Sequence, residues 1–345
     1  MIIAYALTKE SKLQKFEIEA DDPLPKNVVW IDLIEPSIEE EKKVEKVFKI
    51  DTPTREEMDK IEVLSPFYKE DDSYYMTITS INKLDQDYPE GTAITFILTP
   101  KALVTLRYSR PRAFTSFSSR ALRNSSLCQT PDLALEGLVE SIVHGLADSL
   151  DKTGTSIDQL LVDVFDKPSN IKDRKKALKK HLPEDDNNSS NPNLHYTNLI
   201  KKVGRAGNLI SKIKESLVSL NRMLIFFSQI DENRYLSKKD HRVRFRNLTR
   251  EIMSLTEYAN FLAQRNGFLL DATLGMINVE QNLIIKVFTV AAAVFLPPTL
   301  IASIYGMNFH HMPELDWTLG YPFALVLIVL SAVLPYYYFK RKDWL

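Results

Sequence analysis

Two uncharged stretches near the C-terminal end decide the fold of this chain. The first runs from Val287 to Phe309 and reads VFTVAAAVFLPPTLIASIYGMNF, and the second runs from Trp317 to Phe339 and reads WTLGYPFALVLIVLSAVLPYYYF. An α-helix rises about 1.5 Å per residue, so about 20 residues cross a hydrocarbon core about 30 Å thick. Helices buried in soluble proteins seldom run so far without a charge. The sequence therefore predicts two transmembrane helices in a lipid bilayer.

The charges that flank these stretches predict their orientation. Lys286 precedes the first stretch and Lys340–Lys342 follow the second, whereas the connecting loop has no lysine or arginine and carries Glu314 and Asp316. Positively charged flanks stay on the cytosolic side of a membrane. The N-terminal residues Met1–Tyr5 also lack the basic stretch that opens a signal peptide. We therefore expect both termini in the cytosol and the loop outside.

Composition and motifs exclude several other classes of protein. The formal net charge of -1 gives no basic excess that would indicate nucleic-acid binding. The single cysteine, Cys128, has no partner for a disulfide or a thiolate metal site, and we expect it to be buried. The chain has no phosphate-binding loop, no dinucleotide glycine motif and no nucleophile elbow. We therefore expect neither an enzyme nor an organic cofactor.

The sequence that precedes the two apolar stretches predicts an α+β fold with a helical stalk. Residues 1–125 alternate helical and β-rich runs and form the predicted cytosolic α/β domain. Ser37 and Glu40 have the spacing of a capping box at the start of a helix. The predicted strands are Val28–Leu33, Tyr74–Thr79, Ala93–Leu98 and Ala102–Leu106. The predicted later segments are 126–282 (helical stalk), 283–309 (first span), 310–318 (external loop), 319–339 (second span) and 340–345 (basic cytosolic tail).

One face of the last long helix, which we expect to begin near Ser237, is mostly small and polar. Alternating steps of four and three keep one face of a helix toward a bundle axis. A face in contact with lipid should be apolar throughout, so this stripe should face protein or water. The stripe contains Asp271, Gly275, Asn278, Asn282, Ile285, Thr289, Ala292, Leu296, Thr299 and Ser303.

Two interpretations of this stripe remain open at the level of the residues. Small side chains let helices pack closely, which needs no pore. Alternatively, several copies of the chain surround an axis, and each stripe position forms a ring in a pore. Rings of Asp271 would then concentrate cations, and rings of Ile285 and Leu296 would act as a hydrophobic gate.

The residues after the first stretch resemble a known signature. Tyr305–Asn308, followed by Phe309 and Met312–Leu315, resembles the Gly-Met-Asn signature of CorA-type magnesium channels, and the similarity is greatest to the proteobacterial branch. Further similar segments are Glu280–Asn282, Phe295–Leu300, Gly320–Pro322 and Tyr338–Leu345.

The resemblance implies a funnel-shaped homopentamer in a bacterial inner membrane. The first span would line the pore, and Gly306, Met307 and Asn308 would form the selectivity filter at its outer mouth. Pore positions of the family also match Asn282, Thr299 and Ser303 of the stripe, which favours the pore interpretation.

Magnesium chemistry fits such a filter. Mg²⁺ gives up its water slowly and prefers octahedral oxygen coordination, so a ring of asparagine oxygens would hold the hydrated ion through its waters. Glu314 and Asp316 would attract cations beside the filter. The resemblance also leaves Co²⁺ and Ni²⁺ open as further cargo, and His310 and His311 open as ligands for such metals.

The resemblance further implies inhibition by intracellular Mg²⁺ bound between cytosolic subunits. The candidate acidic residues are Asp71, Asp72, Asp85, Asp87 and Asp271. Asn247 stands where one branch of the family has a metal-binding acid, so the regulatory site stays undecided. Two rival functions also remain: a zinc transporter of the same superfamily, against which the intact Met307 argues, and a membrane-anchored enzyme or scaffold.

Overall fold

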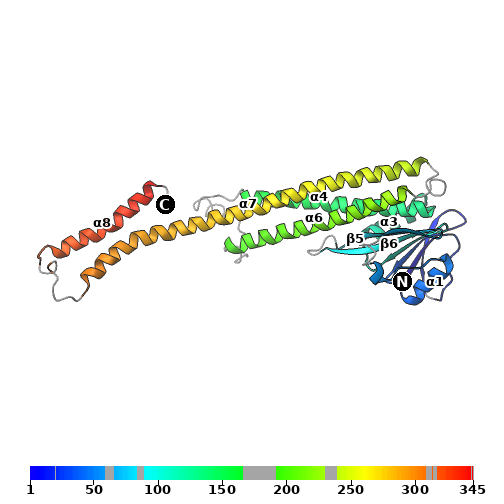
Figure 1. Cartoon of the computed structure of the whole chain (residues 1–345), viewed down its shortest axis with the longest axis horizontal. Coiled ribbons are helices and arrows are strands. Elements are labelled where there is room, and N and C mark those ends of the chain that lie inside the picture. The colour runs from blue at the N-terminus through cyan, green and yellow to red at the C-terminus, as the bar shows by residue number, and fades with distance from the viewer. Residues whose placement is uncertain are drawn as a thin grey trace. The chain divides into compact units, whose positions relative to one another are not determined.

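The computed structural model divides the chain into two compact units, Met1–Leu270 and Asp271–Leu345 (Figure 1). Each unit is described by itself below. The structure describes residues 1–19, 21–58, 66–83, 89–165, 192–229, 239–307, 313, 317–342 and 344.

A seven-stranded mixed sheet forms the centre of the first unit. Its spatial order is β2-β1-β3-β7-β6-β5-β4, in which only the β3–β7 pair is parallel. The predicted strands correspond to β3, β5, β6 and β7, whereas β1, β2 and β4 were not predicted. The strand bounds are β1 Ile2–Leu7, β2 Leu13–Ile18, β3 Val28–Ile34, β4 Phe67–Glu70, β5 Ser73–Asn82, β6 Glu90–Leu98 and β7 Leu103–Arg107.

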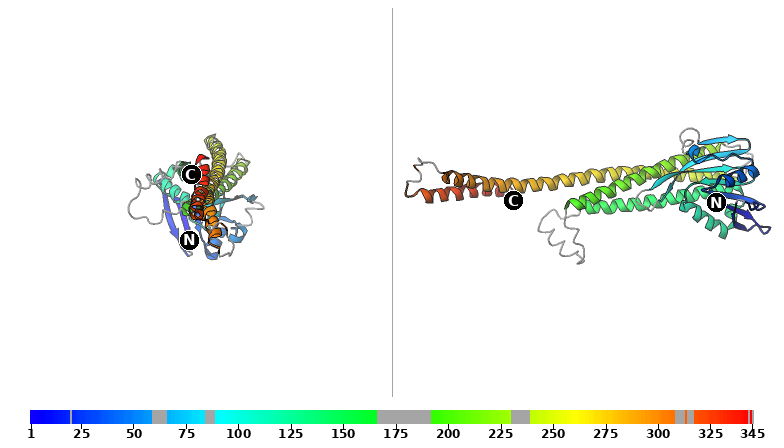
Figure 2. Two further views of the ribbon diagram at one scale, coloured as in Figure 1. Left: turned by 90° about the vertical axis from the view of Figure 1, so that its left-hand side faces the viewer. Right: turned by 90° about the horizontal axis from the view of Figure 1, so that it is seen from below.

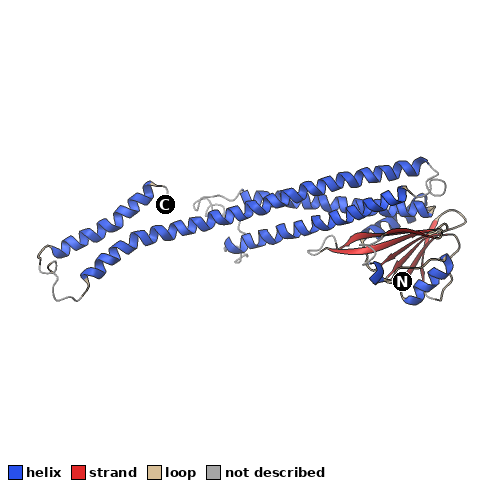
Figure 3. Cartoon of the chain, viewed as in Figure 1, coloured by secondary structure: helices blue, strands red, loops and turns tan. Residues whose placement is uncertain are grey.

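Helices make up most of the remaining described chain, as Figure 3 shows. The capping box predicted at the start of α1 is confirmed, because Ser37 Oγ accepts from Glu40 N at 3.3 Å and Glu40 Oε2 accepts from Ser37 N at 2.8 Å. A short 3₁₀ turn, Ser125–Cys128, separates α3 from α4. The helix bounds are α1 Ile38–Phe48, α3 Arg112–Arg123, α4 Pro131–Phe165, α6 Pro192–Ser228, α7 Lys239–Tyr305 and α8 Gly320–Arg341.

The two faces of the sheet are covered by different helices (Figure 1). Side chains alternate between the faces of a strand, so neighbours along β3 enter different cores. Ile31 and Leu33 join a buried cluster that includes Val44 of α1. On the other face, the ring of Trp30 lies 5.6 Å from that of Phe117 in α3. The sheet is therefore buried on both sides, which explains why its central strands are so apolar.

Glycine allows α3 to lie close against α4. A Cβ atom on Gly137 of α4 would come within 2.1 Å of the Phe117 ring. Any larger residue would push α3 away from this position. Arg120 of α3 adds a polar link, because its Nη2 donates to Ser141 Oγ of α4 at 2.8 Å.

Three helices of the first unit pack along one another: α4, α6 and the part of α7 before residue 271. The rings of Phe227 in α6 and Phe245 in α7 stack with centroids 4.6 Å apart. Arg265 of α7 forms an ion pair with Asp158 of α4. The expected long final helix is confirmed, since α7 continues without a break for 67 residues into the first apolar stretch.

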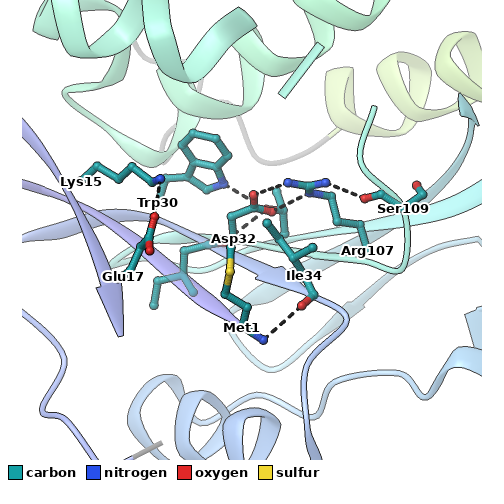
Figure 4. A network of polar contacts seen from close by, with 10 residues as sticks. Met1, Lys15, Glu17, Trp30, Asp32, Ile34, Arg107 and Ser109 are labelled. Carbon is teal, nitrogen blue, oxygen red and sulfur yellow. Dashed lines mark hydrogen bonds and ion pairs between the residues drawn. The ribbon is translucent and has the colours of Figure 1, made fainter. Parts of the chain in front are cut away.

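A buried ion pair connects the parallel strands at the centre of the sheet (Figure 4). Arg107 of β7 donates to Asp32 of β3 from Nε at 3.0 Å and from Nη2 at 2.7 Å. Thr105 Oγ1 donates to the same carboxylate at 2.8 Å and accepts from Trp30 Nε1 at 3.0 Å. The guanidinium also lies 4.5 Å from the centre of the Phe114 ring in α3. Both charges therefore have bidentate pairing although they are buried.

Replacing Asp32 should destabilise the first unit strongly. Asp32→Ala leaves the Arg107 charge buried without its carboxylate, a change that typically lowers the free energy of unfolding by about 3–5 kcal/mol. Urea unfolding of the full chain in detergent, followed by tryptophan fluorescence, measures the effect. The exposed Asp21→Ala is the matched control and should change stability by less than about 0.5 kcal/mol. Equal effects in the two variants would contradict the importance of this pair.

Candidate ion pathway

Two helices of the structure are long and apolar enough to cross a membrane by length and composition: α7 and α8. In the two apolar stretches of these helices, many large apolar side chains are not covered by the described part of the chain. Phe288 is 72% exposed, Phe295 is 71% exposed and Tyr321 is 76% exposed. A core helix of a soluble protein would bury such residues. Their exposure indicates that lipid or further protein covers this surface.

In the second unit, α8 runs back along the C-terminal part of α7 (Figure 2). The residues that become buried here are Val290 on α7 and the small residues Gly320 and Ala324 on α8. Small residues let helix backbones approach closely in membranes. At the other end of α8, Lys286 Nζ lies 5.8 Å from the centre of the Trp344 ring. One side of α7 is therefore occupied by α8.

The predicted stripe lies on a side of α7 that nothing in the described chain covers. Ile285 is 60% exposed and Leu296 is 65% exposed, whereas Val290 is only 4% exposed. All members of the stripe are exposed: Asp271, Gly275, Asn278, Asn282, Ile285, Thr289, Ala292, Leu296, Thr299 and Ser303. Close packing of α7 against α8 therefore does not account for the stripe within one chain.

The threonine hydroxyls on the stripe are bonded in a consistent way. Thr289 Oγ1 donates to the carbonyl of Ile285 at 2.8 Å, and Thr299 Oγ1 donates to the carbonyl of Phe295 at 2.7 Å. A hydroxyl has one proton to donate and two lone pairs. Because the proton is used inside the helix, each oxygen presents lone pairs outward. Such oxygens suit a hydrated cation better than an anion.

Two prolines interrupt the hydrogen bonds of α7 beside the stripe. Pro297 and Pro298 lie inside the helix and have no N–H to donate. The carbonyls four residues earlier, at Ala293 and Val294, therefore lack their usual partner in the helix. This places two additional acceptors in the apolar part of α7.

The first part of the predicted filter lies just beyond the end of α7. Gly306 N donates to the Ala302 carbonyl at 3.0 Å, and Met307 N donates to the Ile304 carbonyl at 3.2 Å. A Cβ on Gly306 would lie 3.2 Å from the Ala302 oxygen, so even alanine would require that carbonyl to shift. The predicted filter residue Asn308 lies outside the described residues. So do His310, His311, Glu314 and Asp316.

The predicted regulatory acids occupy several separate places. Asp71 and Asp72 form the two-residue turn between β4 and β5, where Asp71 adopts a positive φ of 49°. Asp tolerates this left-handed conformation better than most residues, so a local role in the turn explains Asp71. Asp271 is exposed on α7, and Asp85 and Asp87 lie outside the described residues. Within the described ranges, no group of three or more His, Cys, Asp or Glu residues could hold a metal ion.

Comparison with known proteins decides the family. The model of the family described as CorA-like Mg²⁺ transporter protein matches residues 25–341. The magnesium transport protein CorA of Escherichia coli strain K12 is 31% identical over 345 residues, which covers all of both chains. The chain belongs to the CorA family. The resemblance that was predicted from the Gly-Met-Asn signature is therefore confirmed, and this family consists of transporters rather than enzymes.

Solved structures agree with the fold. The complete CorA magnesium transporter of Methanocaldococcus jannaschii has a TM-score of 0.72 at 17% identity, over 100% of this chain and 99% of that one. The ZntB cytoplasmic domain of Vibrio parahaemolyticus has a TM-score of 0.51 at 12% identity, over 80% of this chain and 97% of that domain. The predicted architecture of an α/β domain, a long helix and two C-terminal apolar helices is thus confirmed for this CorA-family chain.

The exposure of the stripe predicts a pattern of chemical labelling. Cys128 is fully buried, and burial raises the pKa of its thiol to about 12, so it should not react in the folded protein. In proteoliposomes without Mg²⁺, Thr299→Cys should react with a membrane-impermeant thiosulfonate because we expect the stripe to face water. Val290→Cys, which is buried on another side of α7, and Phe295→Cys, which flanks the stripe, are the matched controls and should stay unmodified. Labelling of Phe295→Cys as fast as Thr299→Cys would contradict a water-facing stripe.

Proposed function

We propose that this CorA-family chain is a channel that lets Mg²⁺ enter the cell down its electrochemical gradient. The observation that carries the proposal is the uncovered polar stripe of α7, which leads directly to Gly306 and Met307. The chain has no nucleotide-binding motif of the known kinds, so the membrane potential would drive transport. That potential contributes about 2.3 kcal/mol per charge per 100 mV, and twice as much for a divalent ion.

The pore requires several copies of the chain. Two transmembrane helices cannot enclose a pathway, and one side of α7 is already occupied by α8. A homopentamer, in which five copies of the stripe face a common axis, would cover the stripe and leave Phe288 and Phe295 for lipid or α8 of a neighbour. The exposure of all these residues in a single chain supports this arrangement.

Selectivity would come from oxygen atoms that contact the hydrated ion. Asn308 would provide a ring of side-chain oxygens at the outer mouth, with Gly306 and Met307 shaping its backbone. Deeper rings of Thr299 and Asn282 would offer further uncharged oxygens. Weak contacts of this kind suit conduction, because an ion must also leave each site. Co²⁺ and Ni²⁺ resemble Mg²⁺ in preferring compact coordination shells, so they are proposed as minor cargo.

Closure would use the two bulky apolar positions of the stripe. Rings of Ile285 and Leu296 would exclude water when they come close together. Intracellular Mg²⁺ at acidic residues such as Asp271 would favour the closed state by linkage, because ions bind more tightly to that state.

The proposed location is the bacterial inner membrane with both termini in the cytosol. The basic residues Lys286 and Lys340–Lys342 flank the spans on the same side. Residues 310–318 would then form the external loop, where Glu314 and Asp316 attract cations to the pore entrance.

Loss of the asparagine ring should abolish magnesium flux. Proteoliposomes loaded with a magnesium-sensitive dye should fluoresce after external Mg²⁺ is added to the wild-type protein, and Asn308→Ala should lower the initial rate at least tenfold. Asn208→Ala, at an exposed position of α6, makes the same chemical change elsewhere and should leave the rate unchanged. Wild-type flux of Zn²⁺ but not of Mg²⁺ would replace the magnesium function by the zinc alternative.

Truncation of the proposed gate should make the channel leak. Leu296→Ala should raise Mg²⁺ flux severalfold at high internal Mg²⁺, where the wild type is expected to be closed. Leu300→Ala is the control, because Leu300 is also well exposed on α7 but lies off the stripe. Tight closure of Leu296→Ala, or equal leakage of both variants, would rule out a gate at Leu296.

A further inference from the structure

The first unit contains a cavity of about 450 Å³ that the proposed ion pathway does not use. Three elements form its walls: the end of β5, the start of α3 and the middle of α4. Cavities of about 300–1,000 Å³ are typical of sites for small molecules. All the described lining residues belong to the first unit, so the cavity exists within one chain.

Positive charge dominates the described lining of this cavity. It includes five lysine or arginine side chains and one carboxylate, that of Asp148. Two ion pairs lie at its edge: Lys83 Nζ is 3.0 Å from Glu90 Oε1, and Arg120 Nη2 is 3.5 Å from Glu140 Oε2. These pairs are exposed and weak in water. The cationic residues are Lys83, Arg110, Arg112, Arg120 and Lys152.

The start of α3 increases the positive potential at the same place. A helix carries partial positive charge at its N-terminus, which is normally balanced by an acidic residue or a capping side chain. In α3 the N-cap is Pro111, no side chain caps the helix, and the first turn has no acidic residue. Arginines instead stand at its first position, Arg112, and just before it, Arg110. This combination disfavours cations and favours an anionic ligand.

The cavity also keeps room for a ligand along α4. Gly145 lies in the middle of this helix and lines the cavity, and a Cβ there would meet no atom within 4 Å. Glycine in a helix interior is less stabilising than alanine. No neighbouring side chain excludes a larger residue at position 145, so packing does not explain the glycine. Arg120 of α3 is held beside the same helix by its hydrogen bond to Ser141 at 2.8 Å. The site is thus open at Gly145 and has one cationic side chain held in place.

We propose that this cavity binds the phosphate chain of an oligophosphate, either inorganic or part of a nucleotide. Guanidinium groups bind phosphate oxygens through two parallel hydrogen bonds, and several phosphates in a row would match several separated cations. The described lining contains no Phe, Tyr or Trp side chain on which a base could stack, and its one imidazole, His144, already lies 3.8 Å from Glu251 Oε1, so recognition rests on the phosphates. This inference does not depend on magnesium transport.

Calorimetry on the purified full chain in detergent, with all divalent cations removed, tests the proposal. Sodium tripolyphosphate and ATP are the two probes. Arg110→Gln combined with Arg112→Gln should weaken tripolyphosphate binding at least tenfold. Lys201→Gln combined with Lys202→Gln removes the same charge from exposed positions of α6 and should change it less than twofold. Equal affinity for both probes assigns the site to the phosphate chain alone, whereas tighter ATP binding adds contacts to the nucleoside.

Two variants of Gly145 distinguish a loss of binding from a loss of folding. Gly145→Glu should block the cavity and weaken binding at least tenfold, whereas Gly145→Ala should keep both the affinity and the melting temperature. Failure of the wild type to bind either probe would overturn the proposal. So would undiminished binding in Gly145→Glu, or equal loss of affinity in the two pairs of charge variants.

Discussion

The continuity of α7 as one 67-residue helix, despite the two hydrogen bonds lost at Pro297 and Pro298, is the constraint on which the rest of the structure depends. In hydrocarbon every backbone polar group needs a partner, and a continuous helix supplies nearly all of them internally. The regular turn of that helix aligns residues from Asp271 to Ser303 on one side. Since α8 occupies a different side, nothing in the described part of the chain covers the polar stripe. The proposed assembly of several copies would cover this surface, and the proposed ion passage would use it.

In the first unit, the buried ion pair of Asp32 and Arg107 is the corresponding structural constraint. It joins the parallel strands β3 and β7, while Arg107 Nη1 also donates to the carbonyl of Ser109. That contact fixes the turn that leads into α3, and with it the arginines at the start of the helix. The buried ion pair is thus linked through Ser109 to the segment that carries Arg110 to the cavity.

Sequence patterns predicted the elements with strong local signals. The central strands β3, β5, β6 and β7 are apolar and β-rich, and the capping box marked α1. The strand β1 carries an apolar run too short to distinguish from a helix, and β2 is an edge strand whose middle four residues are exposed. The helix α3 has neither a capping side chain nor an acidic first turn. These elements form because the sheet and α4 provide partners, which no local pattern records.

The sequence by itself determined the family, the two apolar helices and the membership of the stripe, because these follow from local composition and helical period. Only the tertiary structure decided which face of α7 meets α8 and which stays uncovered. It also brought Lys83, Arg112 and Lys152 around one cavity, although they lie far apart in the chain. Such groupings depend on how sheet and helices pack, and packing arises from long-range contacts that neither composition nor periodicity encodes.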